Sequence, residues 1–325
     1  MPSKIVSVAS YVPPRVMTND ELAKIVDTSD EWIYSHTGIR SRHIAADDVA
    51  ASDLAVEAAR AALRKASMPA DQIDFIVLST STPDYPGLPS TASIVQDRIG
   101  ATNAGAMDIV AACTGFAYGI STARAYVESG MAETVLVLGA EVYSRILNWK
   151  DRTTCVLFGD GAGATIVQAS SEPGIVDAVL HSRGNGATQL LRPAGGSREA
   201  YEPGITPIER TKLYMDGRRV YTFAVQAIID VVEELLERNN LTIDEIDHFV
   251  PHQANERIIE AACKRAGYDR GRFFVNIAEY ANTSAASIPI ALTEMEARGL
   301  IKKGERIITL GFGAGLAYGG NLIIW

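Results

Sequence analysis

The stretch MDIVAACTGFAYGI, residues 107–120, places one cysteine between an apolar run and a run of small residues. Apolar residues follow Cys113 at steps of four, three and four: Phe116, Ile120, Ala123 and Val127. This spacing predicts a helix that begins near the thiol. A helix N-terminus can lower a thiol pKa from about 8.5 to roughly 3.5–7.5, and the thiolate is the nucleophilic form. We therefore expect a nucleophile at Cys113, although most free cysteines are buried hydrophobic residues.

Two other polar residues stand at comparable places in the sequence. His252 follows Pro251 at the end of an expected strand, and Asn282 opens the small-residue segment ANTSAAS. A histidine can transfer protons or donate a hydrogen bond to an oxyanion, and an asparagine amide donates without titrating. Taken alone, a loop histidine is usually an inert surface residue, and this asparagine would suit a helix N-cap.

The remaining cysteines carry no such expectation. Cys155, in TTCVLFG, is expected in a strand, and Cys263, in EAACKRAG, is expected on a helix face. Three cysteines without a CxxC pair also argue against a disulfide framework and a zinc site.

An internal repeat connects the three candidate residues. The segments QIDFIVLST and EIDHFVPHQ each follow a helical pattern and are expected to form buried strands. The segments ETVLVLGAE and ERIITLGFG follow them at nearly the same separation. Cys113 and Asn282 lie at matching points between these strands, so the order helix, strand, loop, helix, strand occurs twice.

The repeat predicts two similar halves, residues 1–170 and 171–325, related by a pseudo-twofold axis. In α/β sheets, the loops at the carboxyl ends of the strands hold the chemistry. Two halves packed about such an axis would bring the helix N-termini at Cys113 and Asn282 together, with His252 beside them. The sequence thus predicts a large α/β fold with a Cys-His-Asn site.

Two glycine-rich segments need separate interpretations. FGDGAGATIV leads into a strand pattern, so we expect a tight turn between strands and not a nucleotide-binding loop, which needs a following helix. LGFGAGLAYGG, near the C-terminus, is expected to approach the site as a third loop. Its backbone N–H groups could hold an oxyanion, because glycine permits close approach.

Composition limits the possible functions. The chain has 325 residues, 47% of them hydrophobic, and a net charge of −9, which disfavours a nucleic-acid partner. The N-terminal MPSKIVSVASYVPP is not a secretory signal, and no apolar run of about 18 residues predicts a membrane span. We therefore expect a cytoplasmic location without membrane association.

The motifs VAACTGF, PHQANERI, ANTSAAS and GFGAGLAYG, with TSDEWIYSHTGI near the N-terminus, resemble β-ketoacyl-acyl carrier protein synthase III. This family contains the initiating condensing enzymes of type II fatty acid synthesis, and the resemblance runs from about Lys4 to Trp325. It implies a thiolase-like five-layer α-β-α-β-α fold and a homodimer. It also implies an acyltransferase that uses acyl-coenzyme A and acyl carrier protein and needs no metal or redox cofactor.

The resemblance implies roles for individual residues. The catalytic residues would be Cys113, His252 and Asn282, with the backbone N–H groups of Cys113 and Ala314 as oxyanion donors. The coenzyme A contacts would be Trp32, Thr37 and Arg152. The contacts with the carrier protein would be Gln253, Ala254, Asn255, Glu256 and Arg257. Leu88 would line the end of the acyl pocket from the partner subunit.

The sequence departs from the family pattern at three places. His36 stands where the family usually has an arginine that helps to hold coenzyme A, and Arg40 or Arg42 could compensate. The usual triple glycine is here Gly-Ala-Gly, with Ala314 in the middle. The loop around Leu88 is one or two residues longer than usual, so the preferred starter unit stays open.

Three other functions would share parts of this sequence pattern. A ketosynthase III-like enzyme of secondary metabolism would keep the same three catalytic residues but use another acyl donor or acceptor. A biosynthetic thiolase would need a second cysteine in the C-terminal glycine-rich segment, which contains none. A catalytically silent scaffold is disfavoured because Cys113, His252 and Asn282 are all present.

An acidic carrier protein needs a local basic surface on this acidic chain. The segment ANERIIEAACKRAG supplies Arg257, Lys264 and Arg265 on roughly one helical face. We expect these side chains to take part in docking, although charges on a helix are more often simply solvated.

Overall fold

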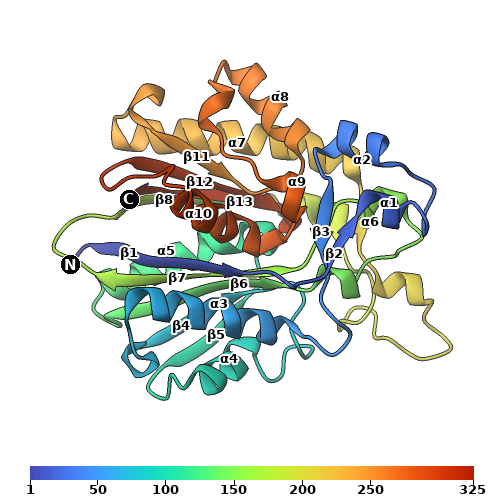
Figure 1. The fold of residues 1–325 in the computed structure, drawn as a ribbon, viewed down its shortest axis with the longest axis horizontal. Helices are drawn as coiled ribbons and strands as arrows, with labels where there is room; N and C mark the ends of the chain where they lie inside the picture. The colour runs from blue at the N-terminus through green and yellow to red at the C-terminus, as the bar shows by residue number, and fades with distance from the viewer.

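The computed structural model, which describes residues 1–325, consists of two β-sheets that alternate with three layers of helices (Figure 1). The first sheet has the strand order β1-β7-β6-β4-β5. Its strands are β1 Ser3–Tyr11, β7 Gly161–Ala169, β6 Thr134–Glu141, β4 Phe75–Ser79 and β5 Gly105–Ile109. The second sheet has the order β11-β12-β13-β8. Its strands are β11 His248–Pro251, β12 Arg306–Gly313, β13 Ala317–Ile324 and β8 Ile175–Ser182.

The second sheet repeats the pairing of the first. β4 is parallel to β6, which is antiparallel to β7, and β11 is likewise parallel to β12, which is antiparallel to β13. The outer strands β1 and β8 are antiparallel to β7 and β13. A parallel bridge between Phe249 and Phe273 occupies the place that β5 has in the first sheet. The predicted duplication is therefore present. The exact boundary between the two halves, residues 1–170 and 171–325, stays a prediction.

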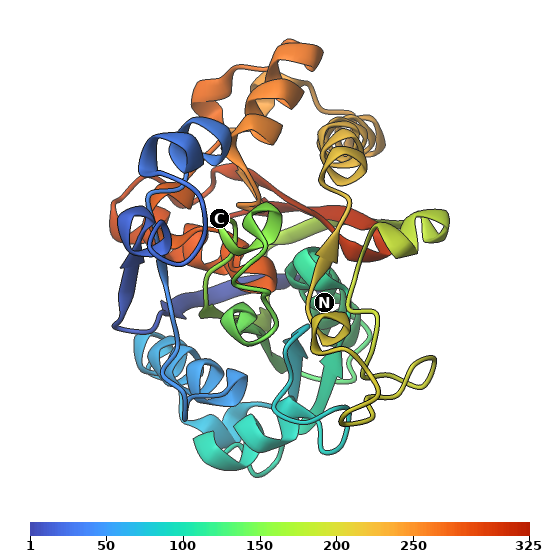
Figure 2. The ribbon, with the colours of Figure 1, turned by 90° about the vertical axis from the view of Figure 1, so that its right-hand side faces the viewer.

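Helices cover both faces of each sheet, as Figures 1 and 2 show. One outer layer contains α3 Ala51–Ala66 and α4 Thr91–Ile99, and the other contains α7 Gly217–Asn239 and α8 Glu256–Ala266. The middle layer contains α5 Gly115–Glu128 and α10 Ser287–Ala297. Each outer layer packs on its sheet through its own buried hydrophobic cluster, and a third cluster joins the middle layer to both sheets. Because sheets cover both sides of the middle layer, most of α10 is apolar and buried.

Short elements gather at the end of the molecule where α2 and α6 lie (Figure 1). They are β2 Val16–Thr18, α1 Asn19–Leu22, α2 Asp30–Thr37, β3 Ser41–His43, α6 Arg152–Cys155, β9 Leu190–Leu191, β10 Tyr214–Met215 and α9 Ile277–Tyr280. The strand predicted around Cys155 is wrong, because the side chain of Asp151 caps a helical turn there. The following glycine-rich segment leads into β7 as predicted, but no strand precedes it.

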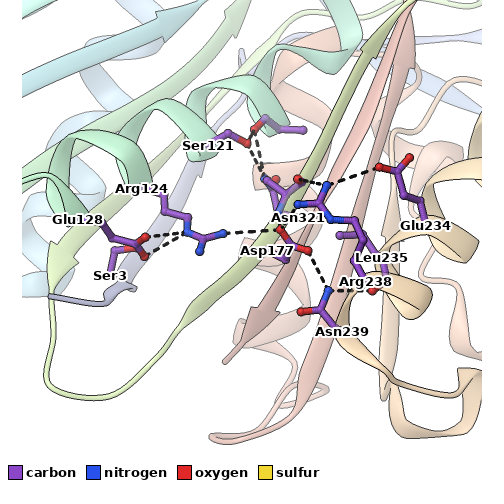
Figure 3. A network of polar contacts seen from close by, with 12 residues as sticks. Ser3, Ser121, Arg124, Glu128, Asp177, Glu234, Leu235, Arg238, Asn239 and Asn321 are labelled. Atoms are coloured by element: carbon purple, nitrogen blue, oxygen red, sulfur yellow. Dashed lines mark hydrogen bonds and ion pairs between the residues drawn. The ribbon is translucent and has the colours of Figure 1, made fainter.

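A polar network ties the middle layer to the second half of the chain (Figure 3). Asp177 on β8 accepts a hydrogen bond from Arg238 on α7 at 2.9 Å and lies 4.0 Å from Arg124 on α5. The Asn321 amide on β13 donates to Ser121 on α5 at 3.0 Å. These contacts fix α5 against the second sheet, and α5 directly follows the segment that carries Cys113. No helix in the structure is both long and apolar enough to cross a bilayer.

Candidate active site

Cys113 lies in a short 3-10 turn, Ala112–Thr114, between β5 and α5. The predicted helix beside the thiol is therefore confirmed. The side chain is only 4% exposed, and the backbone of β12 passes directly against it. A Cβ atom on Gly313 would lie 2.8 Å from the Cβ and 3.1 Å from the Sγ of Cys113. Position 313 therefore needs a glycine to leave room for the thiol.

Cys113, His252 and Asn282 line one cavity of about 230 Å³. The three residues come from the β5–α5 junction, the end of β11 and the segment after α9, as the repeat predicts. All three are buried, whereas His36 and Arg152, which line the same cavity, are exposed. The cavity therefore leads from the surface to the thiol.

Asn282 is held by a hydrogen bond that leaves one end of its amide free. Its Oδ1 accepts from the backbone N–H of Ser284 at 2.8 Å, next to the 3-10 turn Ser284–Ala286, whose N-cap residue is Thr283. Because the oxygen is engaged, the Nδ2 donor is the group left for a molecule in the cavity. The N-cap interpretation of Asn282 is therefore wrong, because Thr283 is the N-cap of this turn and Ala286 is the N-cap of α10.

His252 is neutral in this environment. Burial lowers the pKa of its imidazole to about 3, and no carboxylate offsets this effect. The ring nitrogen Nδ1 lies 2.7 Å from Ser287 Oγ, and Phe312 packs against the ring with centroids 5.3 Å apart. The ring is therefore fixed on two sides, and Nε2 is the nitrogen left without a protein partner.

The thiol of Cys113 is protonated in the free protein. Burial raises its pKa to about 12; the Ser284 hydroxyl opposes this rise, and Glu141 adds to it. The lowered pKa that we expected from the helix N-terminus is therefore wrong for the free protein, because desolvation by burial is the largest effect on the pKa of this thiol. The resting site holds a thiol beside a neutral imidazole, so a thiolate must form when substrate binds.

Glu141, at the end of β6, is fully buried and is close enough to Cys113 to affect the pKa of its thiol. Its carboxylate accepts hydrogen bonds from Thr82 Oγ1 at 2.8 Å and from the Ser81 backbone N–H at 3.0 Å. Burial nevertheless raises the pKa of this carboxyl to about 7. No signal in the sequence distinguished Glu141 from a surface glutamate that follows a strand.

The three predicted coenzyme A contacts line the outer part of the cavity. The guanidinium carbon of Arg152 lies over the indole of Trp32, 4.7 Å from the ring centroid, and the His36 ring stacks on the same indole at 4.4 Å. The hydroxyl of Thr37 points inward and donates to the Ile33 carbonyl at 2.6 Å. A planar cation and an aromatic ring thus lie together where an adenine base could stack.

The proposed compensation for His36 does not occur in this structure. Arg40 pairs with Asp30 at 2.8 Å and covers the Tyr34 ring, whereas Arg42 is fully buried and donates to Asn19 Oδ1 at 2.8 Å. Neither side chain lines the cavity, so Arg152 is its only arginine or lysine.

The predicted carrier-protein motif is only partly accessible. Gln253 is 1% exposed; its amide donates to the Pro251 carbonyl at 2.7 Å and accepts from the Asn276 backbone N–H at 3.1 Å. The prediction that Gln253 contacts a partner protein is therefore wrong, because its side chain braces the chain internally. Ala254 is half-buried in the cavity wall.

The last three motif residues connect α8 to its surroundings. Asn255 caps α8 and donates to the His36 carbonyl, and Glu256 pairs with Arg270 at 3.1 Å. Arg257 donates to the Ser35 carbonyl at 2.7 Å and remains partly exposed. The start of α8 is thus bound to the end of α2, which carries Trp32 and Thr37.

Two predicted residues lie outside the cavity. Leu88 is 87% exposed in the loop before α4, and its role in a partner's acyl pocket stays a prediction. Ala314 lines a neighbouring hollow together with Ala112. Its backbone N–H as an oxyanion donor likewise stays a prediction. No cluster of three metal-ligating side chains occurs in the structure.

Comparison with known proteins identifies the family. The family model for 3-oxoacyl-[acyl-carrier-protein] synthase III matches residues 107–184, and the model for the C terminal of the same enzyme matches residues 236–325. The chain is 48% identical to β-ketoacyl-[acyl-carrier-protein] synthase III of Caldanaerobacter subterraneus over 99% of this chain and 97% of the relative. The chain belongs to the synthase III family.

Solved structures of this family have the same fold. Synthase III from Thermus thermophilus superimposes with a TM-score of 0.92 at 42% identity, covering 99% of each chain. The priming β-ketosynthase of the R1128 polyketide pathway has a TM-score of 0.93 at 36% identity, covering 99% of this chain and 96% of that one. These findings confirm the predicted thiolase-like fold and the prediction of a condensing acyltransferase.

Some residues of this synthase III site were not found from the sequence. Ser287 and Phe312 orient His252, and the Ser284 backbone orients Asn282. One signal was available for Ser287, because it begins the otherwise apolar segment SIPIAL of α10. A polar residue at the start of a buried helix usually has a polar partner.

Proposed function

We propose that this synthase III homologue catalyses the decarboxylative condensation of a short acyl-coenzyme A, such as acetyl-coenzyme A, with malonyl-acyl carrier protein. The products would be β-ketoacyl-acyl carrier protein, coenzyme A and CO2, as in the first condensation of fatty acid synthesis. The observation that carries this proposal is the single cavity that contains Cys113, His252 and Asn282 and opens beside Trp32 and Arg152.

In the first half-reaction, Cys113 Sγ attacks the thioester carbon of the acyl donor. Coenzyme A leaves, and the acyl group remains on the cysteine. The backbone N–H groups of Cys113 and Ala314 stabilise the oxyanion of the tetrahedral intermediate. An alanine serves as well as a glycine as donor, because the donor is main chain.

In the second half-reaction, malonyl-acyl carrier protein enters the same cavity. Its thioester carbonyl accepts hydrogen bonds from Asn282 Nδ2 and His252 Nε2. Loss of CO2 leaves enolate charge on this oxygen, so both donors act mainly in the transition state. The enolate carbon then attacks the acyl-cysteine carbonyl and releases the product.

The dimensions of the cavity favour a small starter unit. Its volume of about 230 Å³ has to hold both the pantetheine arm and the acyl group. Apolar side chains supply much of its wall, among them Val156, Leu157, Leu190, Met215 and Ile258. A short apolar acyl group therefore suits this space better than a long chain.

The surface of α8 supports docking of an acidic carrier protein. Lys264 and Arg265 are exposed near its end, and Arg265 also lines an open groove beside α7. Three further arginines line this groove: Arg183, Arg218 and Arg219. The basic surface is thus wider than the predicted motif, and it complements an acidic partner despite the net negative charge of the chain.

We further propose a homodimer. Leu88 and Val110 are large apolar side chains that are 87% and 83% exposed in the single chain. Val110 directly follows β5, the edge strand of the first sheet, and Leu88 lies in the loop between β4 and α4. A second copy placed against this edge would cover both side chains and bring Leu88 to the partner's acyl pocket.

A second candidate function is the priming condensation of a secondary pathway. The structural similarity to a priming ketosynthase of polyketide synthesis favours this alternative. The same cysteine chemistry would then act with a different acyl donor or acceptor carrier protein.

One experiment tests both candidates. The intact protein is incubated with a panel of acyl-coenzyme A thioesters, and its mass is measured beside that of Cys113→Ala. We expect a gain of one acyl group that the variant lacks, whereas Cys155→Ala and Cys263→Ala gain it normally. If no donor acylates the wild-type protein, the proposal of acyl-coenzyme A as the substrate is wrong.

A further inference from the structure

The hydroxyl of Ser287 contacts three other polar groups in the interior. Its Oγ is 2.7 Å from His252 Nδ1 and 2.9 Å from the Ser284 carbonyl oxygen, and it accepts a longer hydrogen bond of 3.4 Å from the Gln253 backbone N–H. Ser287 is 2% exposed and is the first residue of α10. This hydroxyl therefore has no access to bulk water, and its bonding is decided by these neighbours.

The geometry of these contacts selects one tautomer of His252. A hydroxyl has a single hydrogen, and a carbonyl oxygen can only accept. If Ser287 donates to the Ser284 carbonyl, then the short contact to Nδ1 is a hydrogen bond only when Nδ1 carries the proton. In the opposite tautomer, the single hydroxyl hydrogen can go to Nδ1 or to the Ser284 carbonyl but not to both, whereas the Gln253 N–H can donate to Oγ in either case. The Nδ1–H tautomer is therefore the one in which every contact is a hydrogen bond.

We propose that Ser287 is a positioning residue that holds His252 in the Nδ1–H tautomer, so that Nε2 presents a lone pair to the cavity. This inference rests on the proposed function, in which Cys113 is the nucleophile. It answers a question that the site raises, namely which group takes the thiol proton when both thiol and imidazole start out neutral.

The proton can be followed through the whole cycle. As the bond between Sγ and the acyl carbon forms, the Sγ–H proton passes to Nε2, directly or through one water. The bond between the acyl carbon and coenzyme A breaks, and coenzyme A leaves as a thiolate that takes a proton from water. His252 is then an imidazolium whose Nδ1–H still donates to Ser287.

The second half-reaction returns the proton. Nε2–H now donates to the malonyl thioester oxygen while CO2 leaves. The electrons of the broken C–C bond stay on the thioester as the enolate. The enolate carbon forms the new C–C bond, and the bond from the acyl carbon to Sγ breaks. Sγ recovers its proton from Nε2. The same ring nitrogen thus accepts a proton in the first half-reaction and donates it in the second.

The test compares the state of the ring with the rate of acylation. Protein labelled with 15N-histidine gives nitrogen chemical shifts that distinguish a protonated from an unprotonated ring nitrogen. The signals of His252 are identified by their loss in His252→Gln. We expect a protonated Nδ1 and an unprotonated Nε2 in the free wild-type protein.

Ser287→Ala removes the acceptor for Nδ1–H. We expect the ring to change partly or wholly to the Nε2–H tautomer, and acylation of Cys113 in a single turnover to slow by about tenfold to a hundredfold. Ser287→Thr restores a hydroxyl, so it should restore both the Nδ1–H tautomer and the rate of acylation. Thr293→Ala is the matched control, because it removes another hydroxyl of α10, bonded to the Pro289 carbonyl, that has no contact with His252.

Two results would overturn the inference. One is a protonated Nε2 in the free wild-type protein. The other is that Ser287→Ala changes only one of the two readouts, or neither. Failure of the proposed function is recognised separately, because the ring signals need no turnover, whereas an inactive nucleophile would show as an absent acyl mass shift in the wild-type protein.

Discussion

The Cα of Gly313 faces the thiol of Cys113 so closely that a single added carbon would lie 3.1 Å from its sulfur. Cys113 thus lies between the start of α5 and the backbone of β12. This contact couples the second sheet directly to the reacting atom.

Gly313→Ala should therefore displace the nucleophile. The added methyl overpacks the site, and we expect a loss of about 1–3 kcal/mol in the free energy of unfolding. This loss leaves most of the protein folded, so unfolding by itself should hardly reduce the rate of acylation. We expect the acylation of Cys113 to slow much more, because the thiol is displaced. Urea denaturation and single-turnover acylation measure the two effects. Gly196→Ala is the control, because its Cβ would meet nothing within 4 Å; equal acylation rates in the two variants would refute the steric argument.

Asn282→Ala should separate the two half-reactions. We expect condensation to fall about 100- to 1,000-fold, because the amide donates to the enolate oxygen, while acylation of Cys113 stays nearly intact. The variant also loses the bond from the Ser284 N–H, so its thermal unfolding must be measured as well. A folded variant that cannot be acylated would show that the assigned role is wrong.

Glu141 should make stability depend on pH. Its pKa is raised from the ordinary 4.5 to about 7 in the fold, so the folded state holds a proton that the unfolded state has lost in this range. The associated stabilisation is complete below about pH 4.5 and is lost as the pH rises through 7. Relative to the wild-type protein, Glu141→Gln should become more stable between pH 5 and pH 8 in urea denaturation. Glu172→Gln, at an exposed site, should show no such trend, and a flat difference for Glu141→Gln would contradict the raised pKa.

Charge reversal on the basic surface should weaken binding of the carrier protein alone. Arg257 is a poor first choice, because it also donates to the Ser35 carbonyl next to the coenzyme A site. Lys264→Glu and Arg218→Glu change exposed side chains, and each should raise KM for malonyl-acyl carrier protein but not for acyl-coenzyme A. The effect should shrink at high salt, because exposed charges are screened. An equal rise in both KM values would remove the docking proposal.

The reactive thiol gives a further pH test. Because burial raises the pKa of Cys113 to about 12, iodoacetamide alkylation of the free protein should accelerate steadily from pH 7 to pH 10 without a plateau. Mass spectrometry after digestion distinguishes Cys113 from Cys155 and Cys263. A plateau near neutral pH would instead show that the helix N-terminus lowers the pKa, as the sequence suggested.

Much of the fold and the central site could be predicted from the sequence, because both depend on order along the chain. The repeat of strand patterns placed Cys113 and Asn282 at matching points, and His252 followed a strand end. The failures concern properties that depend on three-dimensional environment. Burial reversed the expected pKa of Cys113, and internal hydrogen bonds removed Gln253 from the surface. Local sequence does not encode how many layers cover a residue.

The bond from Arg257 to the Ser35 carbonyl, together with the close packing of Gly38 against Glu256, holds the end of α2 against the start of α8. The residues proposed to read the nucleotide of one substrate and the protein carrier of the other therefore share a common support. The two proposed substrates would therefore bind on either side of one contact between helices.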